Sequence, residues 1–566
     1  MQRGECTSGV MTRDIRANPV VIRPDTSIGN NSAEADDEFL FECFVDHPAL
    51  DVTRDVTNSK MFVLARTGGG KTAIIRKINK QFADTSSVID LSGLSMDYVA
   101  NSNIIRFLQS IDIDLDLFFQ ALWKHVLCLE YIRLRYEVKN DENSRQVFGW
   151  FRDFFRSDGR RQSALKYLSE WEGKFFITMD ENIKEITAKL ESKVNTELSA
   201  EIEKFNARAG YSRTLSSEKK SELVARAKRI VNAEQLAELN KVLDLLSTYD
   251  SDDGKYKKSF YILIDKLDEK WVDETIRFDL IRALIECLRS FNKLSHLKIV
   301  VAIREDVLER VVQDNRDIGF QREKYDDYFL RVVWTNSQLK ELVQRRINKL
   351  YKKKYTSENV TFDDIFRNKI GNKEPMDYII ERTLKRPRDV ISFVNECFQK
   401  AQGKTEVSPK IIKEAESQYS RIRMQALISE WQSAFPSLST AFKLLANRRG
   451  RFTSRDISDK AFLDEFALNI DQRGITESDP IGAGVNRYIR DGAEVASLPL
   501  VRTLVSELYR IGAIGVKTSS GERYIYSFQD VPVISPDSID LDTKIHIHPM
   551  LHRALNVQDE PQRSNA

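Results

Sequence analysis

Short, mainly apolar runs recur along the chain, and each has the length of a buried β-strand. There are five of them: Met61–Ala65, Ser86–Leu91, Ser259–Ile264, His296–Ile303 and Leu330–Trp334. Strands that are apolar on both sides are typical of a parallel sheet covered by helices. Because segments with helical periodicity separate these runs, the pattern predicts an α/β fold with a five-stranded parallel sheet.

A charged segment with its own helical pattern interrupts this alternation between about residues 139 and 257. One apolar stripe in it has steps of three and four residues and runs through Ile183, Ile186, Leu190, Val194, Leu198, Ile202 and Phe205. A second stripe runs from Leu223 to Leu246, beyond Gly210. The pattern predicts two antiparallel helices inserted into the sheet domain. Two interpretations fit: a solvated helical arm, or a lever or oligomerisation element.

Beyond residue 335 the pattern becomes mainly helical. Residues 336–408 predict a helical lid, in which Pro387 suits the first turn of a helix. Residues 409–566 begin with a long helix and end with two apolar runs, Ala513–Val516 and Tyr524–Phe528, across the turn Thr518–Glu522. Helices followed by a hairpin predict a winged-helix-like α+β domain, a module that contacts either DNA or proteins.

The composition completes the domain plan: a flexible arm at residues 1–37, a core at 38–335 with the helical insertion, the lid and the C-terminal domain. With 41% hydrophobic and 30% charged residues and a net charge of +2, the chain is neither a polycation nor an acidic protein. Its five cysteines are scattered without a CxxC pair, which indicates a reducing compartment and no zinc site. No apolar run reaches the length of a membrane span, and we expect a cytoplasmic protein.

The segment Met61–Ile78, MFVLARTGGGKTAIIRKI, combines a strand, a glycine-rich turn, Lys-Thr and an amphipathic helix. This is the order of a Walker A phosphate loop, with Ala65 at the place of the pattern's first glycine. Glycines let backbone N–H groups surround a phosphate at a helix N-terminus. Lys71 is expected to reach the β- and γ-phosphates of ATP, and the Thr72 hydroxyl to bind Mg²⁺. The predicted nucleotide-binding residues are Ala65, Arg66, Thr67, Gly68, Gly69, Gly70, Lys71 and Thr72.

An acid follows the buried run at residues 259–264, as in a Walker B motif. Asp265 is expected to hold Mg²⁺ through water, and a second acid to orient the attacking water. Lys266 occupies the next position, so this second role falls to Asp268 or Glu269. A chance acidic turn after a strand is the alternative explanation.

Two arginines are candidates for sensing the γ-phosphate. Arg304 ends the strand run at residues 296–303, and Arg388 lies in the lid sequence Arg386-Pro387-Arg388-Asp389. Each is equally compatible with an ordinary surface arginine. Near the C-terminus, His546, His548 and His552 lack an acid or cysteine at ligand spacing, and we interpret them as strand-end and surface residues.

Taken together, the chain resembles P-loop ATPases of the AAA+ and STAND groups. The resemblance rests on ARTGGGKT at Ala65–Thr72, IDKLDEKW at Ile264–Trp271, VVAIRED at Val300–Asp306 and LKRPRD at Leu384–Asp389. The IDxLDxxW form is similar to KAP-type bacterial ATPases, and the order of core, lid and winged helix to archaeal origin-recognition proteins. The resemblance implies an ATP-dependent switch that forms homo-oligomers and acts with a protein effector, in phage defence or on mobile elements.

Three hypotheses follow. The first is a cytoplasmic Mg·ATP-hydrolysing switch that controls assembly or a partner effector in anti-phage defence. The second is an ATP-gated loader or initiator that binds double-stranded DNA through its winged helix. The third, suggested by Lys266, is a scaffold that holds ATP without turnover.

Overall fold

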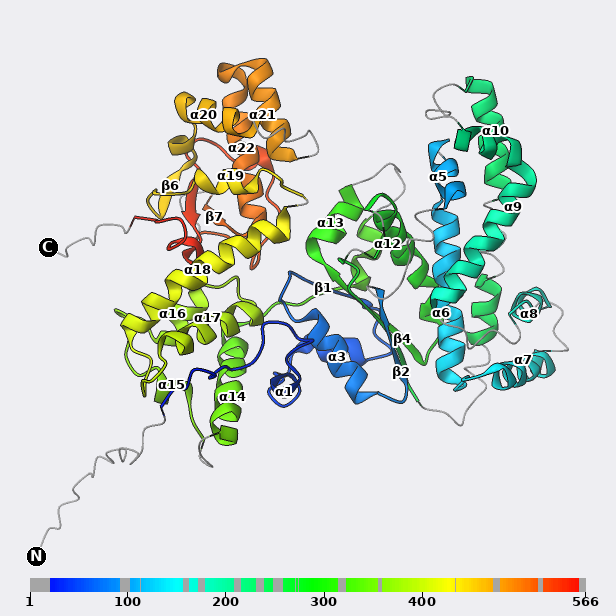
Figure 1. The fold of residues 1–566 in the computed structure, drawn as a ribbon, viewed down its shortest axis with the longest axis horizontal. Helices are drawn as coiled ribbons and strands as arrows, with labels where there is room; N and C mark the ends of the chain where they lie inside the picture. Colours follow the sequence, from blue (N-terminus) through cyan, green and yellow to red (C-terminus); the bar gives the residue numbers. More distant parts are fainter. Residues whose placement is uncertain are drawn as a thin grey trace, which may run out of the picture. The chain divides into compact units, whose positions relative to one another are not determined.

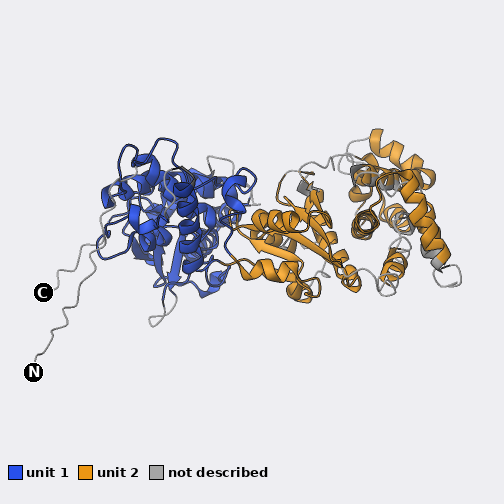
Figure 2. Cartoon of the chain, turned by 90° about the horizontal axis from the view of Figure 1, so that it is seen from below, with its two compact units in different colours: residues 1–45, 334–566 blue, residues 46–333 orange. Residues whose placement is uncertain are grey.

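The computed structural model describes residues 21–91, 102–111, 113, 115–155, 162–171, 179–207, 215–230, 239–247, 258–269, 271–272, 274–313, 322–354, 359–432, 434–471, 479–517 and 523–558. The chain forms two compact units, shown in different colours in Figure 2. Unit 1 contains residues 1–45 and 334–566, and unit 2 contains residues 46–333. Within the described residues, no helix is both long and apolar enough to cross a membrane.

Unit 2 is built on a parallel sheet of five strands, which confirms the predicted fold class of this region. The strand order is β2-β3-β4-β1-β5. Every side chain of β3 is buried, as the unbroken apolar run predicts. The strands are β1 (Phe62–Ala65), β2 (Ser86–Asp90), β3 (Phe260–Asp265), β4 (Leu297–Arg304) and β5 (Phe329–Arg331).

Helices cover this sheet and extend from it (Figure 1). Helix α3 packs against β1, β2, β3 and β4, while α6 packs against β2, β3 and α12. The helices and 3₁₀ turns of unit 2 are α2 (Pro48–Arg54), α3 (Lys71–Gln81), α5 (Asn103–Ser110), α6 (Asp116–Arg135), α7 (Asp141–Phe155), α8 (Gln162–Ser169), α9 (Met179–Ala207), α10 (Ser217–Ile230), α12 (Glu274–Leu288), η4 (Arg289–Lys293), α13 (Glu305–Gln313) and η5 (Arg322–Tyr328).

The predicted insertion is helical, and its first apolar stripe lies on α9. Val194, Leu198 and Ile202 are buried in the core of unit 2, where α9 packs against α5 and α6. Figure 1 shows α9 running alongside α5 and α6. The stripe is therefore covered by helices of the same chain, although α9 is kinked at Leu198. Gly210, the expected turn, lies outside the described residues.

Unit 1 combines a helical part with a small antiparallel sheet. The helices and 3₁₀ turns are α1 (Asp37–Leu40), α14 (Asn336–Lys354), α15 (Phe362–Ile365), α16 (Pro375–Glu381), α17 (Pro387–Lys400), α18 (Pro409–Trp431), α19 (Leu438–Lys443), η6 (Ser454–Ile457), α20 (Lys460–Asp471), α21 (Pro480–Asp491), α22 (Ala493–Ile511), η7 (Pro536–Ser538) and η8 (Pro549–Leu551). The strands are β6 (Arg451–Thr453), β7 (Ile514–Lys517) and β8 (Lys544–Ile547), in the order β6-β8-β7.

The predicted C-terminal hairpin forms only in part. Strand β7 forms as expected, but its partner is β8, which pairs with it along its whole length. The segment Tyr524–Phe528 contributes a single bridge, between Ile525 and Val516. A turn begins at Tyr526, whose carbonyl accepts from the Asp530 amide at 2.8 Å and whose own amide donates to the Asp530 carboxylate at 2.9 Å. This turn ends the pairing, and the expected hairpin turn at 518–522 lies outside the described residues.

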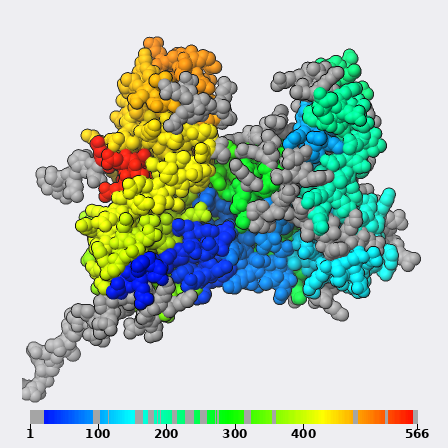
Figure 3. All heavy atoms as spheres, in the orientation of Figure 1, coloured from blue at the N-terminus to red at the C-terminus, as the bar shows by residue number. Residues whose placement is uncertain are grey.

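Residues 21–37 differ from the flexible arm that their composition predicts. Ile22 and Ile28 are buried, and the Ile22 amide donates to the Lys404 carbonyl at 2.8 Å. Asp36 forms a buried ion pair with Arg346 of α14 at 2.6 Å. Figure 3 shows this dark blue segment lying against the yellow-green lid helices. The buried side chains of Ile22 and Ile28 and the Asp36–Arg346 ion pair therefore hold the segment against the rest of unit 1. Of the predicted arm, residues 1–20 lie outside the described residues.

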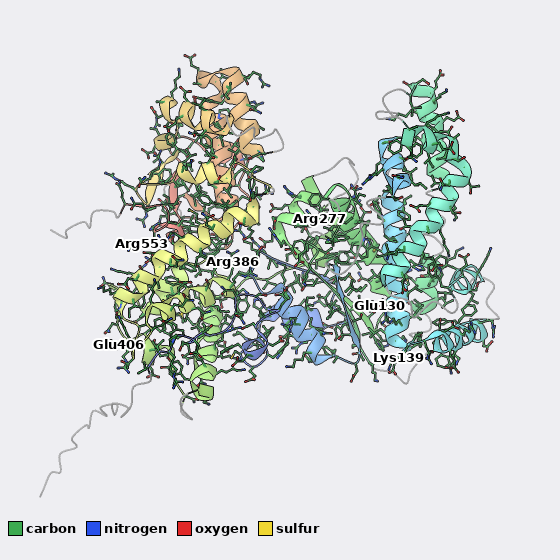
Figure 4. The ribbon with its side chains drawn as sticks, viewed as in Figure 1. Glu130, Lys139, Arg277, Arg386, Glu406 and Arg553 are labelled. Carbon is green, nitrogen blue, oxygen red and sulfur yellow. The ribbon has the colours of Figure 1, made fainter. Side chains whose placement is uncertain are left out.

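A buried cluster of charges joins α17 to α18. It contains Arg386 and Asp389, the first and last residues of the sequence Arg386-Pro387-Arg388-Asp389 (Arg386 is labelled in Figure 4). Asp389, which is fully buried, accepts from Arg386 Nε at 2.9 Å and from Arg423 Nη1 at 2.9 Å. Arg386 Nη1 also lies 3.4 Å from Glu430. Burial alone would raise the pKa of Asp389, but the two guanidinium groups outweigh burial and lower it. Arg386 and Asp389 thus serve the packing of the lid.

Removing the central carboxylate should loosen this part of unit 1. We expect Asp389→Ala to cost about 3–5 kcal/mol, because Arg386 and Arg423 would stay buried without their partner. Hydrogen exchange of the α17 and α18 amides, followed by mass spectrometry, should accelerate at least about a hundredfold. The matched control is Asp542→Ala, which removes an exposed partner of Arg455 and should leave this exchange unchanged. Equal exchange in the two variants would contradict a structural role for the cluster.

Candidate functional site

The carboxyl ends of β1, β4 and β3 meet at one edge of the parallel sheet, with β4 in the middle. Ala65, the last residue of β1, pairs with Arg304, the last residue of β4. Asp265 ends β3, the strand on the other side of β4, so three strand ends place chemically active residues side by side. In open α/β sheets, this edge is where ligands bind.

The loop between β1 and α3 requires its three glycines. Gly68 and Gly70 have φ values of 77° and 101°, in the region that favours glycine. Gly69 has no room for a side chain, because a Cβ there would lie 2.8 Å from the Ala65 Cβ and 3.0 Å from the Arg66 carbonyl oxygen. Gly70 is the N-cap of α3, so the loop leads its backbone directly into the helix N-terminus. Such a terminus, with its unpaired N–H groups, favours an anion.

Lys71, the first residue of α3, is turned back over this loop. Its ammonium group donates to the carbonyl oxygens of Ala65 at 3.0 Å and of Arg66 at 3.5 Å. The side chain is buried, and burial lowers the pKa of Lys71 while the carboxylates of Asp268 and Asp265 oppose that shift. A buried ammonium held by neutral carbonyls is ready to exchange them for an anion.

Asp265 and Thr72 form a hydrogen-bonded pair beside Lys71. The Asp265 carboxylate accepts from the Lys266 amide at 2.9 Å and from the Thr72 side chain. Burial raises the pKa of Asp265, and these hydrogen bonds and the charge of Lys71 oppose the rise. One carboxylate and one hydroxyl together fit a Mg²⁺ ion, which takes few protein ligands and keeps waters and substrate phosphates as the others. No group of three or more candidate ligands for a metal occurs among the described residues.

The chain turns sharply after Asp265, and this turn distinguishes the two candidate acids. Lys266 has a φ of 63°, and its carbonyl accepts from the Glu269 amide at 3.1 Å. Asp268 faces the site: its carboxylate lies 3.6 Å from Arg304 Nη1 and acts on the charges of Lys71 and Asp265. Glu269 is exposed, and its carbonyl accepts from Arg277 at 3.3 Å. The geometry therefore favours Asp268 over Glu269.

Arg304 ends β4, which lies between β1, the strand before the glycine-rich loop, and β3, the strand that ends at Asp265. Its guanidinium group is already bound by carboxylates. Asp306 binds it in a bidentate manner, with Nε–Oδ1 at 2.8 Å and Nη2–Oδ2 at 2.6 Å. Asp306 was not among the predicted residues, although it stands two positions after Arg304 in the same polar strand end. A neighbouring pair also went unpredicted: Glu305 accepts from Arg331 at 2.6 Å and lies 3.8 Å from Arg66.

Arg388, the other predicted sensor, belongs to unit 1. Its Nε donates to the carbonyl of Asn31 at 3.0 Å, and burial lowers the pKa of the Arg388 guanidinium. The structure gives this arginine a partner in the segment before α1, and its expected role at a nucleotide remains a prediction.

The basic side chains of α22 and of the turn at Arg448–Arg451 lie in different environments. Helix α22, which precedes β7, is mostly buried from Leu500 to Ile511. Arg502 of this helix donates to the Ile539 carbonyl at 2.9 Å, and Arg510 lies 3.5 Å from Glu507. In the basic turn, Arg448 folds over the Phe462 ring at 4.7 Å, while Arg449 and Arg451 are exposed.

The three C-terminal histidines have hydrogen-bond partners within the fold. His548 accepts from the Met550 amide, His552 bonds the Ile547 carbonyl at 2.9 Å, and His546 bonds the Tyr526 hydroxyl. Their positions at and after the end of β8 agree with the interpretation as strand-end residues, but the surface part of that interpretation is wrong, because His548 is buried and His546 and His552 are partly buried.

Comparison with known proteins finds two similarities. Residues 337–428 match a family described as a FunZ-associated C-terminal helical domain, which covers α14 to most of α18. The whole chain is similar to a protein of Escherichia coli (strain K12) described as the putative transposon gamma-delta 80.3 kDa protein. The two are 21% identical over 547 residues, a match that covers 94% of this chain and 67% of the relative.

The glycine requirement of the loop can be tested without a ligand. Gly70→Ala places a Cβ at a φ of 101° and should cost roughly 1–2 kcal/mol, so the α3 amides should exchange about tenfold faster. The matched control is Gly149→Ala on α7, where a Cβ would meet nothing within 4 Å. That change should slow exchange in α7, because alanine favours a helix interior over glycine. Unchanged α3 exchange in Gly70→Ala would contradict the left-handed conformation at this position.

Proposed function

We propose that unit 2 binds ATP at the carboxyl edge of its sheet and hydrolyses it, and that the protein acts as a nucleotide-dependent switch. The observation that carries this proposal is the convergence of Lys71, the Thr72–Asp265 pair and the Asp268–Arg304 pair around one glycine-rich loop. A cation for phosphate, a pair for Mg²⁺ and an acid for the attacking water are the parts that phosphoryl transfer needs.

Each side chain has a role in this proposal. The loop amides and the Lys71 ammonium would bind the β- and γ-phosphates, which replace the carbonyls of Ala65 and Arg66 as partners of Lys71. Thr72 and Asp265 would hold Mg²⁺, which neutralises phosphate charge. Asp268 would orient water and accept its proton, since Glu269 is exposed. Arg304 would contact the γ-phosphate after exchanging one of its carboxylate partners.

The switch hypothesis includes partners. We propose that nucleotide state controls homo-oligomer assembly or a protein effector, with Arg388 as a candidate contact to the nucleotide. The relative is described as a transposon protein, which supports a mobile-element setting beside the phage-defence setting. We do not extend the proposal to duplex DNA binding by α22, because most of that helix from Leu500 onward is buried.

The binding half of the proposal is tested with Lys71→Ala. Removing the ammonium should weaken Mg·ATP binding at least about a hundredfold, because phosphate loses its charged donor in a buried site. Isothermal titration calorimetry on the full chain measures the affinity. The control is Lys80→Ala, an exposed lysine in the last turn of the same helix, which should bind as the wild type does. Equal affinity in Lys71→Ala and the wild type would refute the nucleotide site.

The catalytic half is tested by comparing two neighbouring acids. Asp268→Asn should lower the single-turnover hydrolysis rate by about a hundredfold or more while ATP still binds. Glu269→Gln, one position further on, should change the rate less than about threefold because this side chain is exposed. A larger loss in Glu269→Gln would reverse the assignment. Tight binding with no turnover in the wild type would favour the scaffold hypothesis.

A further inference from the structure

Two carboxylates contact different parts of the Arg304 guanidinium group, and they hold it with different strength. Asp306 accepts from Nε at 2.8 Å and from Nη2 at 2.6 Å, whereas Asp268 lies 3.6 Å from Nη1. The first two distances are those of charge-assisted hydrogen bonds, and the third is longer than a hydrogen bond. Asp306 therefore holds Arg304 more tightly than Asp268 does.

The planar shape of the guanidinium group gives this difference a direction. Its N–H donors form a rigid fork, in which Nε and Nη2 share one edge and Nη1 and Nη2 share another. Because Asp306 binds the first edge of Arg304, it turns Nη1 and the second edge toward Asp268. The Arg304 and Asp306 side chains are only 15% and 16% exposed, so salt screens this ion pair little.

The backbone fixes the place of Asp306. Strand β4 ends at Arg304 and α13 begins at Glu305, so no loop residue separates the arginine from the helix that carries Asp306. Glu305 accepts from Arg331, the last residue of β5, at 2.6 Å, which holds the first turn of α13 against the sheet. The helix dipole favours a carboxylate in this first turn. Asp306 thus has a defined position before any ligand binds.

The guanidinium group that Asp306 holds lies close to the residue assigned to the phosphates. The charges of Arg304 and Asp268 both act on the buried Lys71 ammonium group. An anion that binds Lys71 therefore comes within range of Arg304 as well. Of the two carboxylates on Arg304, Asp268 is the one that a phosphate would displace, because its contact is the longer one.

We propose that Asp306 is a positioning residue that makes the site select nucleoside triphosphates over diphosphates. It holds Arg304 with the Nη1 edge directed at the γ-phosphate, the group that a diphosphate lacks. The inference rests on the proposed function, because it requires nucleotide binding at the glycine-rich loop. It adds that the selection depends on a carboxylate that itself touches no nucleotide.

Calorimetric titration of the full chain with ATP and with ADP, both in the presence of Mg²⁺, tests this role. Asp306→Asn should lower the ratio of ATP affinity to ADP affinity at least about tenfold, because an amide offers Arg304 one acceptor oxygen instead of two. Loss of the negative charge alone would act in the opposite direction, since it removes repulsion and ATP carries more negative charge than ADP. The control is Asp327→Asn, which changes an exposed aspartate of the same unit and should leave the ratio unchanged.

Further variants show whether Asp306 acts through Arg304. Arg304→Gln should lower the same ratio by itself, and adding Asp306→Asn to it should lower the ratio no further. Asp306→Glu keeps the carboxylate and should retain more of the ratio than Asp306→Asn does. The inference is overturned by an equal loss of ATP and ADP affinity in Asp306→Asn, by an unchanged or raised ratio, or by additive effects in the double variant.

The outcomes separate this inference from the proposed function. If the wild type binds neither nucleotide, both are wrong. If the wild type binds ATP and Lys71→Ala does not, the nucleotide site stands, and an unchanged ratio in Asp306→Asn then removes only the role of Asp306. Retained ADP binding shows that the Asp306→Asn variant is folded.

Discussion

The position of β4 between β1 and β3 is the constraint on which the candidate site depends. The pairing of Ala65 with Arg304 fixes where β4 ends relative to the glycine-rich loop. The pairing of Ile264 with Val301 fixes where β3 ends relative to the same strand. A slip by one residue would turn each side chain to the opposite face of the sheet, where the closely packed interior has no matching space for it. Lys71, Asp268 and Arg304 come together only because β1, β3 and β4 end at the same level of the sheet.

The charged groups at this edge are held by one another without a ligand, and these contacts determine what a ligand has to displace. Asp268 and Asp306 lie 3.6 Å and 2.6 Å from Arg304, and the charges of Asp268 and Asp265 act on Lys71. Buried charges are tolerated only when they are paired. An anion arriving with a divalent cation brings both signs, so it can take over Lys71 and Arg304 while the cation takes over Asp265. If the proposed function holds, this arrangement would favour the joint binding of phosphate and Mg²⁺ over either alone.

Much of the sheet unit follows from local pattern, since every strand coincides with one of the five predicted runs and the loop with a glycine-rich stretch, although β2 is partly exposed at Val88. The sequence left Asp268 and Glu269 equivalent, because spacing alone does not reveal the left-handed turn at Lys266 that separates their directions. Composition suggested a flexible arm at residues 21–37, but burial of Ile22 and the Asp36–Arg346 ion pair depends on residues more than 300 positions away. The hairpin prediction was incomplete for a similar reason. The strand that pairs with β7 along its whole length is β8, and β8 lies beyond an intervening turn at Tyr526.

The lid motif shows why neighbouring basic residues cannot be assigned one role from sequence. Lys385 lies in the wall of a cavity, Arg386 is buried against Asp389, and Arg388 bonds the Asn31 carbonyl. Their backbone positions differ in kind: Lys385 has a left-handed φ, Arg386 is the extended N-cap of α17, and Arg388 lies in the first turn of that helix. Successive side chains across the start of a helix point in different directions, so basic residues within four positions of one another lie in different environments.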